Sequence, residues 1–126
     1  MSTQWMSDVT SFHRRFNQPV AAAPTWPGDD AMTFRDRIMR EEWEETAQAI
    51  KDRDLAEVAD GLIDLIYGAL GTFVVLGIDP EPLWQAVHQA NMAKQPDGTK
   101  KPVKPAGWTP PDIQKLIEAQ THRPTK

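Results

Sequence analysis

The chain has 126 residues, enough for one domain with a real hydrophobic core but not for two. Its hydrophobic content of 40% and charged content of 25% are ordinary for a soluble globular protein. The net charge of -4 gives no basic footprint for nucleic-acid backbones, and the absence of cysteine excludes disulfides, thiolate catalysis and zinc–thiolate sites. We therefore expect a single cytoplasmic domain, residues 1–126, without a nucleic-acid partner.

No secretory or membrane segment is expected. Residues 1–16 lack the apolar core and the small-residue cleavage site of a secretory signal. The longest apolar run, residues 62–77, is shorter than the about 20 residues that span a bilayer, and it contains Asp64. A buried helix without a membrane partner fits this run better.

Apolar residues recur along the chain at helical intervals, and no segment alternates as a strand would. Ser7, Asp54 and Asp79 are predicted N-caps, Pro80 suits a first helical position, and Gly77 suits a left-handed helix end. Four long helices are predicted, over about residues 7–16, 29–53 (capped by Asp29 or Asp30), 54–76 and 79–94.

The C-terminal quarter of the chain is predicted to differ from the rest. Residues 95–109 are rich in proline, glycine and lysine, which is typical of an extended arm, and a short amphipathic helix is expected at 110–120. Four or five helices with short connections predict an all-α, four- to five-helix bundle. The third helix is apolar on nearly every face, so we expect the chain to form a symmetric homo-oligomer.

Acidic residues in the second helix continue an apolar stripe. Ile38, Glu42, Glu45 and Ala49 follow one another at intervals of four, three and four residues. Glu41 lies at the edge of this stripe, four residues before Glu45. Because like charges on adjacent turns repel, such a cluster is destabilising unless a cation lies within it.

A second acidic face is predicted on the third helix, where Glu57, Asp60, Asp64 and Tyr67 share one side with Gly61 among them. Asp64 is the only charged residue between positions 62 and 76. Burying an isolated carboxylate costs several kcal/mol unless it is paired or binds a metal.

Two interpretations of Asp64 remain open. In the first, Arg35 or Arg37 pairs with Asp64. In the second, the two acidic faces form a cage of oxygen ligands, which Mg²⁺ or Mn²⁺ prefers and which bundle cores can hold. A di-iron site is a rival, but it normally requires Glu-x-x-His pairs, and the three histidines occupy no such motif: His13, His88 and His122.

Several segments together resemble a known family. "EEWEE" supplies Glu41, Glu42 and Glu45, and "DLIYGALGTFVVLGID", "VHQANMAK" and "DGTKKPVKPAGW" extend the resemblance over about two-thirds of the chain. These segments resemble the all-α nucleoside triphosphate pyrophosphohydrolases of the MazG-like group, which includes phosphoribosyl-ATP pyrophosphohydrolase-like and dimeric-dUTPase-like members. Their signature is E-E-x-x-E followed by E-x-x-D.

The second half of that signature has two possible registers. "EVAD", Glu57 to Asp60, matches it literally but follows the first motif closely. The register that we favour places the family aspartate at Asp64 and the family glutamate at Gly61, which cannot ligate. Asp60 or Glu57, on the same helix face, would then supply the missing carboxylate.

The resemblance implies hydrolysis of a (deoxy)nucleoside triphosphate between its α and β phosphates, with two or more Mg²⁺ or Mn²⁺ ions per site. Glu41 and Glu42 are the implied catalytic residues, and Glu41 would act as general base or bind a second metal. The implied ligands of the first metal are Glu42, Glu45, Asp64, and Asp60 or Glu57.

Phosphate-binding residues are also implied. Asn91 and Lys94 resemble the family's phosphate-binding pair, and Lys104 is a further candidate that would reach the site of a neighbouring subunit. The alternative is that these lysines interact only with solvent and a helix end. A base pocket is the least defined feature, since aromatic residues at helical spacing often belong to a core; the candidates are Phe12, His13, Phe16 and Trp26.

Family members form dimers or dimers of dimers, and we expect the same of this chain. The flat aromatic candidates favour dGTP or GTP as substrate, with dUTP as the alternative. A non-enzymatic helical interaction module, whose acids are merely solvated, is the rival from a different functional class.

Overall fold

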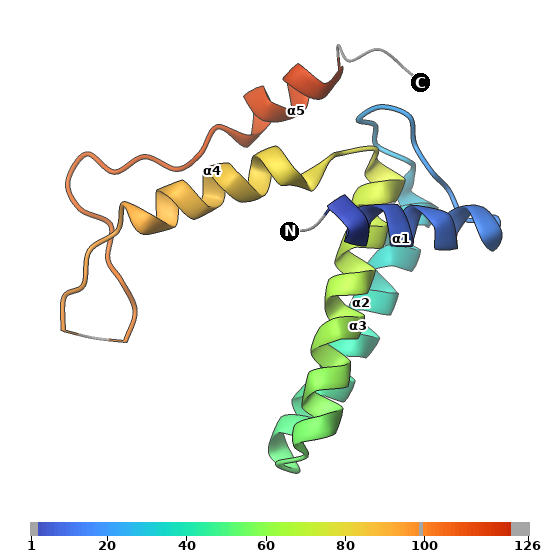
Figure 1. The fold of residues 1–126 in the computed structure, drawn as a ribbon, viewed down its shortest axis with the longest axis horizontal. Helices are drawn as coiled ribbons and strands as arrows, with labels where there is room; N and C mark the ends of the chain where they lie inside the picture. The colour runs from blue at the N-terminus through green and yellow to red at the C-terminus, as the bar shows by residue number, and fades with distance from the viewer. Residues whose placement is uncertain (1–2, 99, 122–126) are drawn as a thin grey trace.

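The structure is a computed structural model, and residues 3–98 and 100–121 are described. Its helices are α1 (Thr3–Arg15), α2 (Asp29–Lys51), α3 (Leu55–Leu76), α4 (Pro80–Met92) and α5 (Ile113–Thr121) (Figure 1). These described residues contain no strand beyond one isolated bridge between Gln95 and Val103. The predicted all-α class is confirmed.

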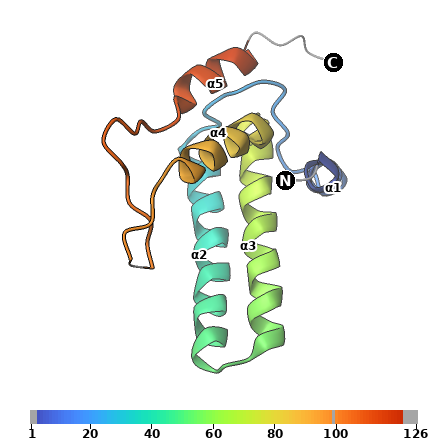
Figure 2. The same cartoon turned by 60° about the vertical axis from the view of Figure 1, so that its left-hand side comes forward.

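The centre of the fold is an antiparallel hairpin of α2 and α3 (Figure 2). Arg53 adopts a left-handed conformation (φ 53°) in the turn between them, and the Asp54 side chain caps α3 by accepting from the Glu57 N–H at 3.2 Å. Gly77 ends α3 with φ 69°, where a β-carbon would be strained. The predicted caps of α3 are therefore confirmed.

Helix α1 packs against the C-terminal half of α3 and completes the core. Val9, Leu70 and Val74 form its buried centre, with Met6 packed against them. The N–H of Ala21, in the loop after α1, donates to the Val74 carbonyl at 3.1 Å. This loop therefore closes the end of the hairpin.

A buried arginine joins α2 to α3. Arg35 is 4% exposed; its Nε donates to Thr72 Oγ1 at 3.1 Å and its Nη2 donates to the Gly68 carbonyl at 2.9 Å. Burial lowers the pKa of Arg35 from its usual value. The guanidinium therefore connects the two helices and does not pair with Asp64.

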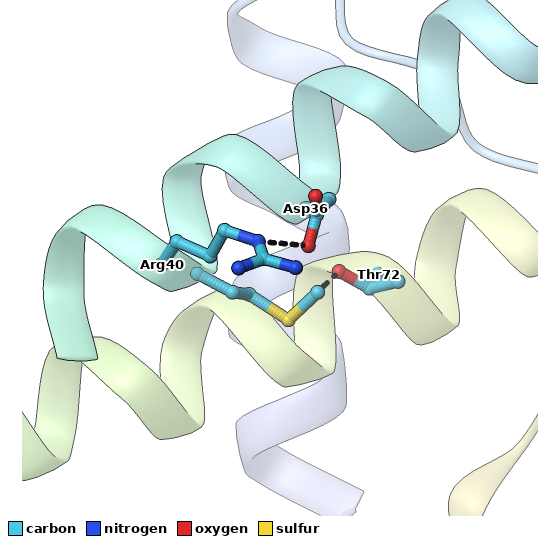
Figure 3. A network of polar contacts seen from close by, with 4 residues as sticks. Asp36, Arg40 and Thr72 are labelled. Carbon is cyan, nitrogen blue, oxygen red and sulfur yellow. Dashed lines mark hydrogen bonds and ion pairs between the residues drawn. The ribbon is translucent and has the colours of Figure 1, made fainter.

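The other arginines of α2 lie on its water-facing side. Arg40 pairs with Asp36 at 2.9 Å, with both side chains largely exposed (Figure 3). Arg37 lies over the Phe34 ring, 5.4 Å from its centroid. The pairing of Asp64 with Arg35 or Arg37 is therefore absent from the described residues.

Helices α4 and α5 form a separate arm. α4 leaves the hairpin where α3 ends and points away from it, and α5 returns alongside α4 (Figure 1). The buried Gln120 fastens the two helices at Asp79, accepting from its N–H at 2.7 Å and donating to its carbonyl at 3.0 Å. Asp79 and Pro80 begin α4 as predicted.

Two predicted N-caps, Ser7 and Asp29 or Asp30, were wrong. α1 begins at Thr3, so Ser7 lies inside it; the preceding turn is stabilised because Met6 packs on the core. α2 begins without a side-chain cap, since Gly28 occupies the N-cap position and the Asp29 carboxylate accepts from Trp26 Nε1 at 3.2 Å.

Within the part of the chain that the structure describes, α3 is long and apolar enough to cross a membrane, counting length and composition alone. It exceeds the apolar run considered from sequence because it begins at Leu55. About a third of its apolar window is buried by the rest of the chain, and core helices of soluble proteins have the same composition. The absence of a membrane partner stays a prediction.

Candidate active site

Carboxylates from α2 and α3 converge on Glu42. Burial raises the pKa of Glu42 above its ordinary value, and the neighbouring charges of Asp64, Glu45 and Asp60 raise it further. Asp64 also lies close enough for its carboxyl group to share a proton with Glu42. The helices can approach closely here because Gly61 of α3 packs directly against α2.

One oxygen of Glu42 is enclosed without a partner. Its Oε2 is buried, and no hydrogen-bond donor among the described residues reaches it. A buried acceptor without a donor is costly, and neighbouring anions increase the cost. A proton on Glu42 or a bound cation would remove both the cost of the unpaired acceptor and the repulsion between the carboxylates. Carboxylate oxygens are ligands that suit Mg²⁺ or Mn²⁺.

The convergence is incomplete as a metal site. Within residues 3–98 and 100–121, no three Asp, Glu or His side chains are grouped closely enough to hold a metal ion. Glu41 and Glu57 are both exposed, and neither is among the groups that raise the pKa of Glu42. The ligand roles of Glu42, Glu45, Asp60 and Asp64 therefore stay predictions, as do those of Glu41 and Glu57.

The predicted phosphate-binding residues lie on the arm. Asn91 is in the last turn of α4, and Lys94 follows that helix. Gln95 and Val103 exchange backbone hydrogen bonds of 2.9 and 2.8 Å, which returns the chain so that Lys104 approaches Lys94.

Both lysines contact one indole ring. The Nζ atoms of Lys94 and Lys104 lie 5.5 and 4.9 Å from the centroid of Trp108. This group is separate from the acids, because the loop at the end of α4 lies far from the middle of the hairpin (Figure 1). Trp108 was not among the predicted site residues, and its contact with both lysines was not predicted from the sequence.

Aromatic rings gather beside the acidic face. Phe12 packs on Phe16 with centroids 4.8 Å apart and meets Tyr67 edge-on at 5.6 Å. All three rings are partly exposed, and Tyr67 lies one turn beyond Asp64 on α3. Tyr67 was not among the predicted base-pocket residues, although its three-residue spacing from Asp64 was visible in the sequence.

The other two predicted base-pocket residues lie elsewhere. His13 is 2% exposed, and its Nδ1 is 2.9 Å from the Pro19 carbonyl, so it belongs to the core in this conformation. Trp26 is exposed and bonded to Asp29. Phe12 and Phe16 are the base-pocket candidates that remain on the acidic side.

A sequence model of the phosphoribosyl-ATP pyrophosphohydrolase family matches residues 9–91. The chain belongs to this family. The match contains both acidic faces, so the convergence on Glu42 lies within the matched residues. No curated protein matches the chain.

Membership of the phosphoribosyl-ATP pyrophosphohydrolase family gives the chain a nucleotide pyrophosphohydrolase fold and implies pyrophosphohydrolase activity in general. It agrees with the predicted resemblance to the MazG-like group. The match ends at Asn91, before Lys94, Lys104 and Trp108. The family assignment therefore rests on most of α1, the hairpin and α4, and not on the segment that carries both lysines and Trp108.

Proposed function

We propose that the protein is a metal-dependent (deoxy)nucleoside triphosphate pyrophosphohydrolase, converting a (d)NTP and water to a (d)NMP and diphosphate. The observation that carries this proposal is Glu42, whose partly buried carboxylate is surrounded by Asp64, Glu45 and Asp60 and has one oxygen without a donor. A cluster of this charge suits divalent cations and the polyphosphates that bind them.

Glu42, Glu45, Asp60 and Asp64 would hold one Mg²⁺ or Mn²⁺, with Glu57 as the alternative to Asp60. Bound metal would neutralise charge on the phosphates and lower the pKa of the attacking water. The exposed Glu41, at the edge of the cluster, would accept the proton of that water. Water would cleave the anhydride between the α and β phosphates. Its oxygen would form a bond to one of the two phosphorus atoms, the bond from that phosphorus to the bridging oxygen would break, and the monophosphate and diphosphate would separate.

Glu45→Gln tests the assignment of the acids. It removes one charge from the cluster while keeping the shape of the side chain, so triphosphate hydrolysis should be lost without loss of helical content or a fall in melting temperature. Glu44→Gln, an exposed change on the same helix, should retain wild-type turnover. Full turnover by Glu45→Gln in excess Mg²⁺ would contradict the site.

Product analysis tests the reaction. Chromatography of products from canonical triphosphates and dUTP should show monophosphate and diphosphate in equal amounts, without orthophosphate.

The identity of the base is a separate question. We propose a purine substrate such as dGTP or GTP because Phe12, Phe16 and Tyr67 offer flat surfaces beside the acids. Preferred turnover of dUTP would support the alternative substrate. Absence of turnover, with no Mn²⁺-dependent rise in melting temperature, would favour an interaction module.

We also propose a homo-oligomer, a dimer or a dimer of dimers, in which the lysines of one copy serve the acids of another. Support comes from the segment after α4, which contains both lysines and lies far from the middle of the hairpin (Figure 1). Large apolar side chains exposed on α3, including Ile63 and Leu62, would be covered in such an assembly.

Mixed oligomers test this arrangement. Glu45→Gln and the double variant Lys94→Ala/Lys104→Ala should each be inactive alone. If the site combines two copies, random mixing into dimers leaves one intact site in each heterodimer and restores about one quarter of wild-type activity. If activity does not return after the two variants are refolded together, the acids and the lysines that form one site belong to the same chain.

A further inference from the structure

Trp108 organises the basic end of the arm. Its indole Nε1 donates to the Ala90 carbonyl in α4 at 2.7 Å, and its backbone N–H donates to the Pro105 carbonyl at 3.0 Å. The ring is thereby fixed to the last turns of α4, although it lies 18 residues further along the chain. One residue thus fastens the returning segment to the helix that precedes Lys94.

The ring also brings two like charges together. The Nζ atoms of Lys94 and Lys104 lie 5.5 and 4.9 Å from its centroid. An aromatic face attracts each ammonium group, but the two ammonium groups repel each other. Neither forms an ion pair with a described residue, so the pair presents uncompensated positive charge.

Backbone hydrogen bonds stabilise the chain segments on which the two lysines lie. The paired hydrogen bonds between Gln95 and Val103 close the intervening loop next to both lysines, and the Lys94 N–H donates to the Asn91 carbonyl at 3.1 Å. Lysine side chains are long and flexible, so holding both head groups at one ring, next to a hydrogen-bonded backbone, lowers the entropy lost when an anion is bound. A chain of linked phosphates is an anion long enough to contact two ammonium groups at once.

We propose that Trp108 is a positioning residue that holds Lys94 and Lys104 as a pair for the polyphosphate of the substrate. The inference rests on the proposed triphosphate chemistry and adds to it the residue that sets the lysine spacing. Trp108 does not touch the reacting atoms; it acts through the two ammonium groups and through its bond to Ala90.

The first experiment measures binding without hydrolysis. Inorganic triphosphate is titrated into the full chain in excess EDTA, and its affinity is measured by calorimetry. Trp108→Ala should weaken binding about 10-fold, a loss comparable to one charge-assisted hydrogen bond. Trp108→Phe keeps an aromatic face and should recover part of that affinity. Lys100→Ala, which removes one charge from the same loop away from the ring, should change the affinity by less than about two-fold.

The second experiment separates positioning from general charge. If Trp108 acts through the lysines, adding Trp108→Ala to Lys94→Ala/Lys104→Ala should cause no further loss of triphosphate affinity. With an active substrate, Trp108→Ala should raise KM about 10-fold and change kcat by less than about two-fold. Circular dichroism and the melting temperature show whether each variant keeps its fold.

The outcomes distinguish this inference from the proposed function. Three results would overturn the role of Trp108. Trp108→Ala could bind triphosphate as tightly as the wild type, Lys100→Ala could lose as much affinity as Trp108→Ala, or Trp108→Phe could bind as weakly as Trp108→Ala. Metal-free binding does not depend on turnover, so an enzyme that hydrolyses no nucleotide but binds triphosphate through Trp108 and the lysines would refute only the proposed reaction.

Discussion

Gly61 of α3 lies directly against Thr46 of α2. A β-carbon at position 61 would collide with the Thr46 hydroxyl and lie 3.1 Å from its Cβ, and Thr46 itself is completely buried. The Thr46 hydroxyl donates to the Glu42 carbonyl at 2.7 Å, which fixes the Thr46 side chain one turn beyond Glu42. In the register favoured from sequence, the resemblance to the MazG-like group predicts a glutamate at the position of Gly61. The helix spacing therefore leaves no room to restore that carboxylate.

Gly61→Ala should destabilise the fold by about 1–3 kcal/mol because the added methyl group overpacks the contact with Thr46. Urea unfolding measures this loss. Gly68→Ala is the matched control on the same helix: its β-carbon would make an ordinary 3.6 Å contact with Met39, so it should be neutral or slightly stabilising. Equal effects of the two changes would show that the close approach at Gly61 is not limiting.

Asp60→Asn should reduce activity far more than Glu57→Gln. Asp60 is one of the groups that raise the pKa of Glu42, whereas Glu57 is exposed in the first turn of α3 and is not one of them. We expect Asp60→Asn to raise the Mn²⁺ concentration required for half-maximal turnover about 10-fold or more, as loss of a ligand would. Glu57→Gln should change it by less than about two-fold. Equal, small losses would mean that neither residue binds metal.

Glu42 should make the metal-free protein less stable as pH rises. Because its pKa is raised in the folded chain, the folded state binds the proton more tightly than the unfolded state does. The free energy of unfolding therefore falls as pH increases from the ordinary value of about 4.5 through the raised pKa, and becomes level above it.

Glu42→Gln tests this pH dependence. In EDTA the variant should melt at a higher temperature than the wild type near pH 8, and the difference should shrink towards pH 4. Glu44→Gln, exposed on the same helix, should follow the wild type throughout. If the wild type instead melted at a higher temperature than Glu42→Gln, by a margin that grew with pH, the pKa of Glu42 would be lowered in the folded chain and not raised.

Arg35→Ala should be strongly destabilising, by about 2–4 kcal/mol, because it removes two hydrogen bonds between α2 and α3 and leaves a buried cavity. Arg40→Ala removes an exposed pair with Asp36 and should cost about 0.5 kcal/mol or less. Chemical denaturation of both variants makes the comparison. A small effect at Arg35 would show that its hydrogen bonds add little to the stability of the hairpin.

The sequence by itself determined the all-helical class and the caps of α3 and α4. Asp54, Gly77, Asp79 and Pro80 act locally, within one turn of the helix end that they define, so their roles could be predicted without knowing the fold. Helical spacing likewise placed Glu42 with Glu45 and Asp60 with Asp64, because residues three or four apart share a helix face. Family motifs then indicated that these two faces belong to one site.

Only the tertiary structure decided which side chains meet across helices. Arg35 bonds to Thr72 and Gly68 rather than Asp64, and His13 enters the core, because these partners are set by how α1, α2 and α3 pack. Lys94 and Lys104 meet at Trp108 through a loop closure that no helical period describes. Spacing along one helix is fixed by its geometry, whereas contacts between elements depend on burial and backbone approach summed over the whole chain.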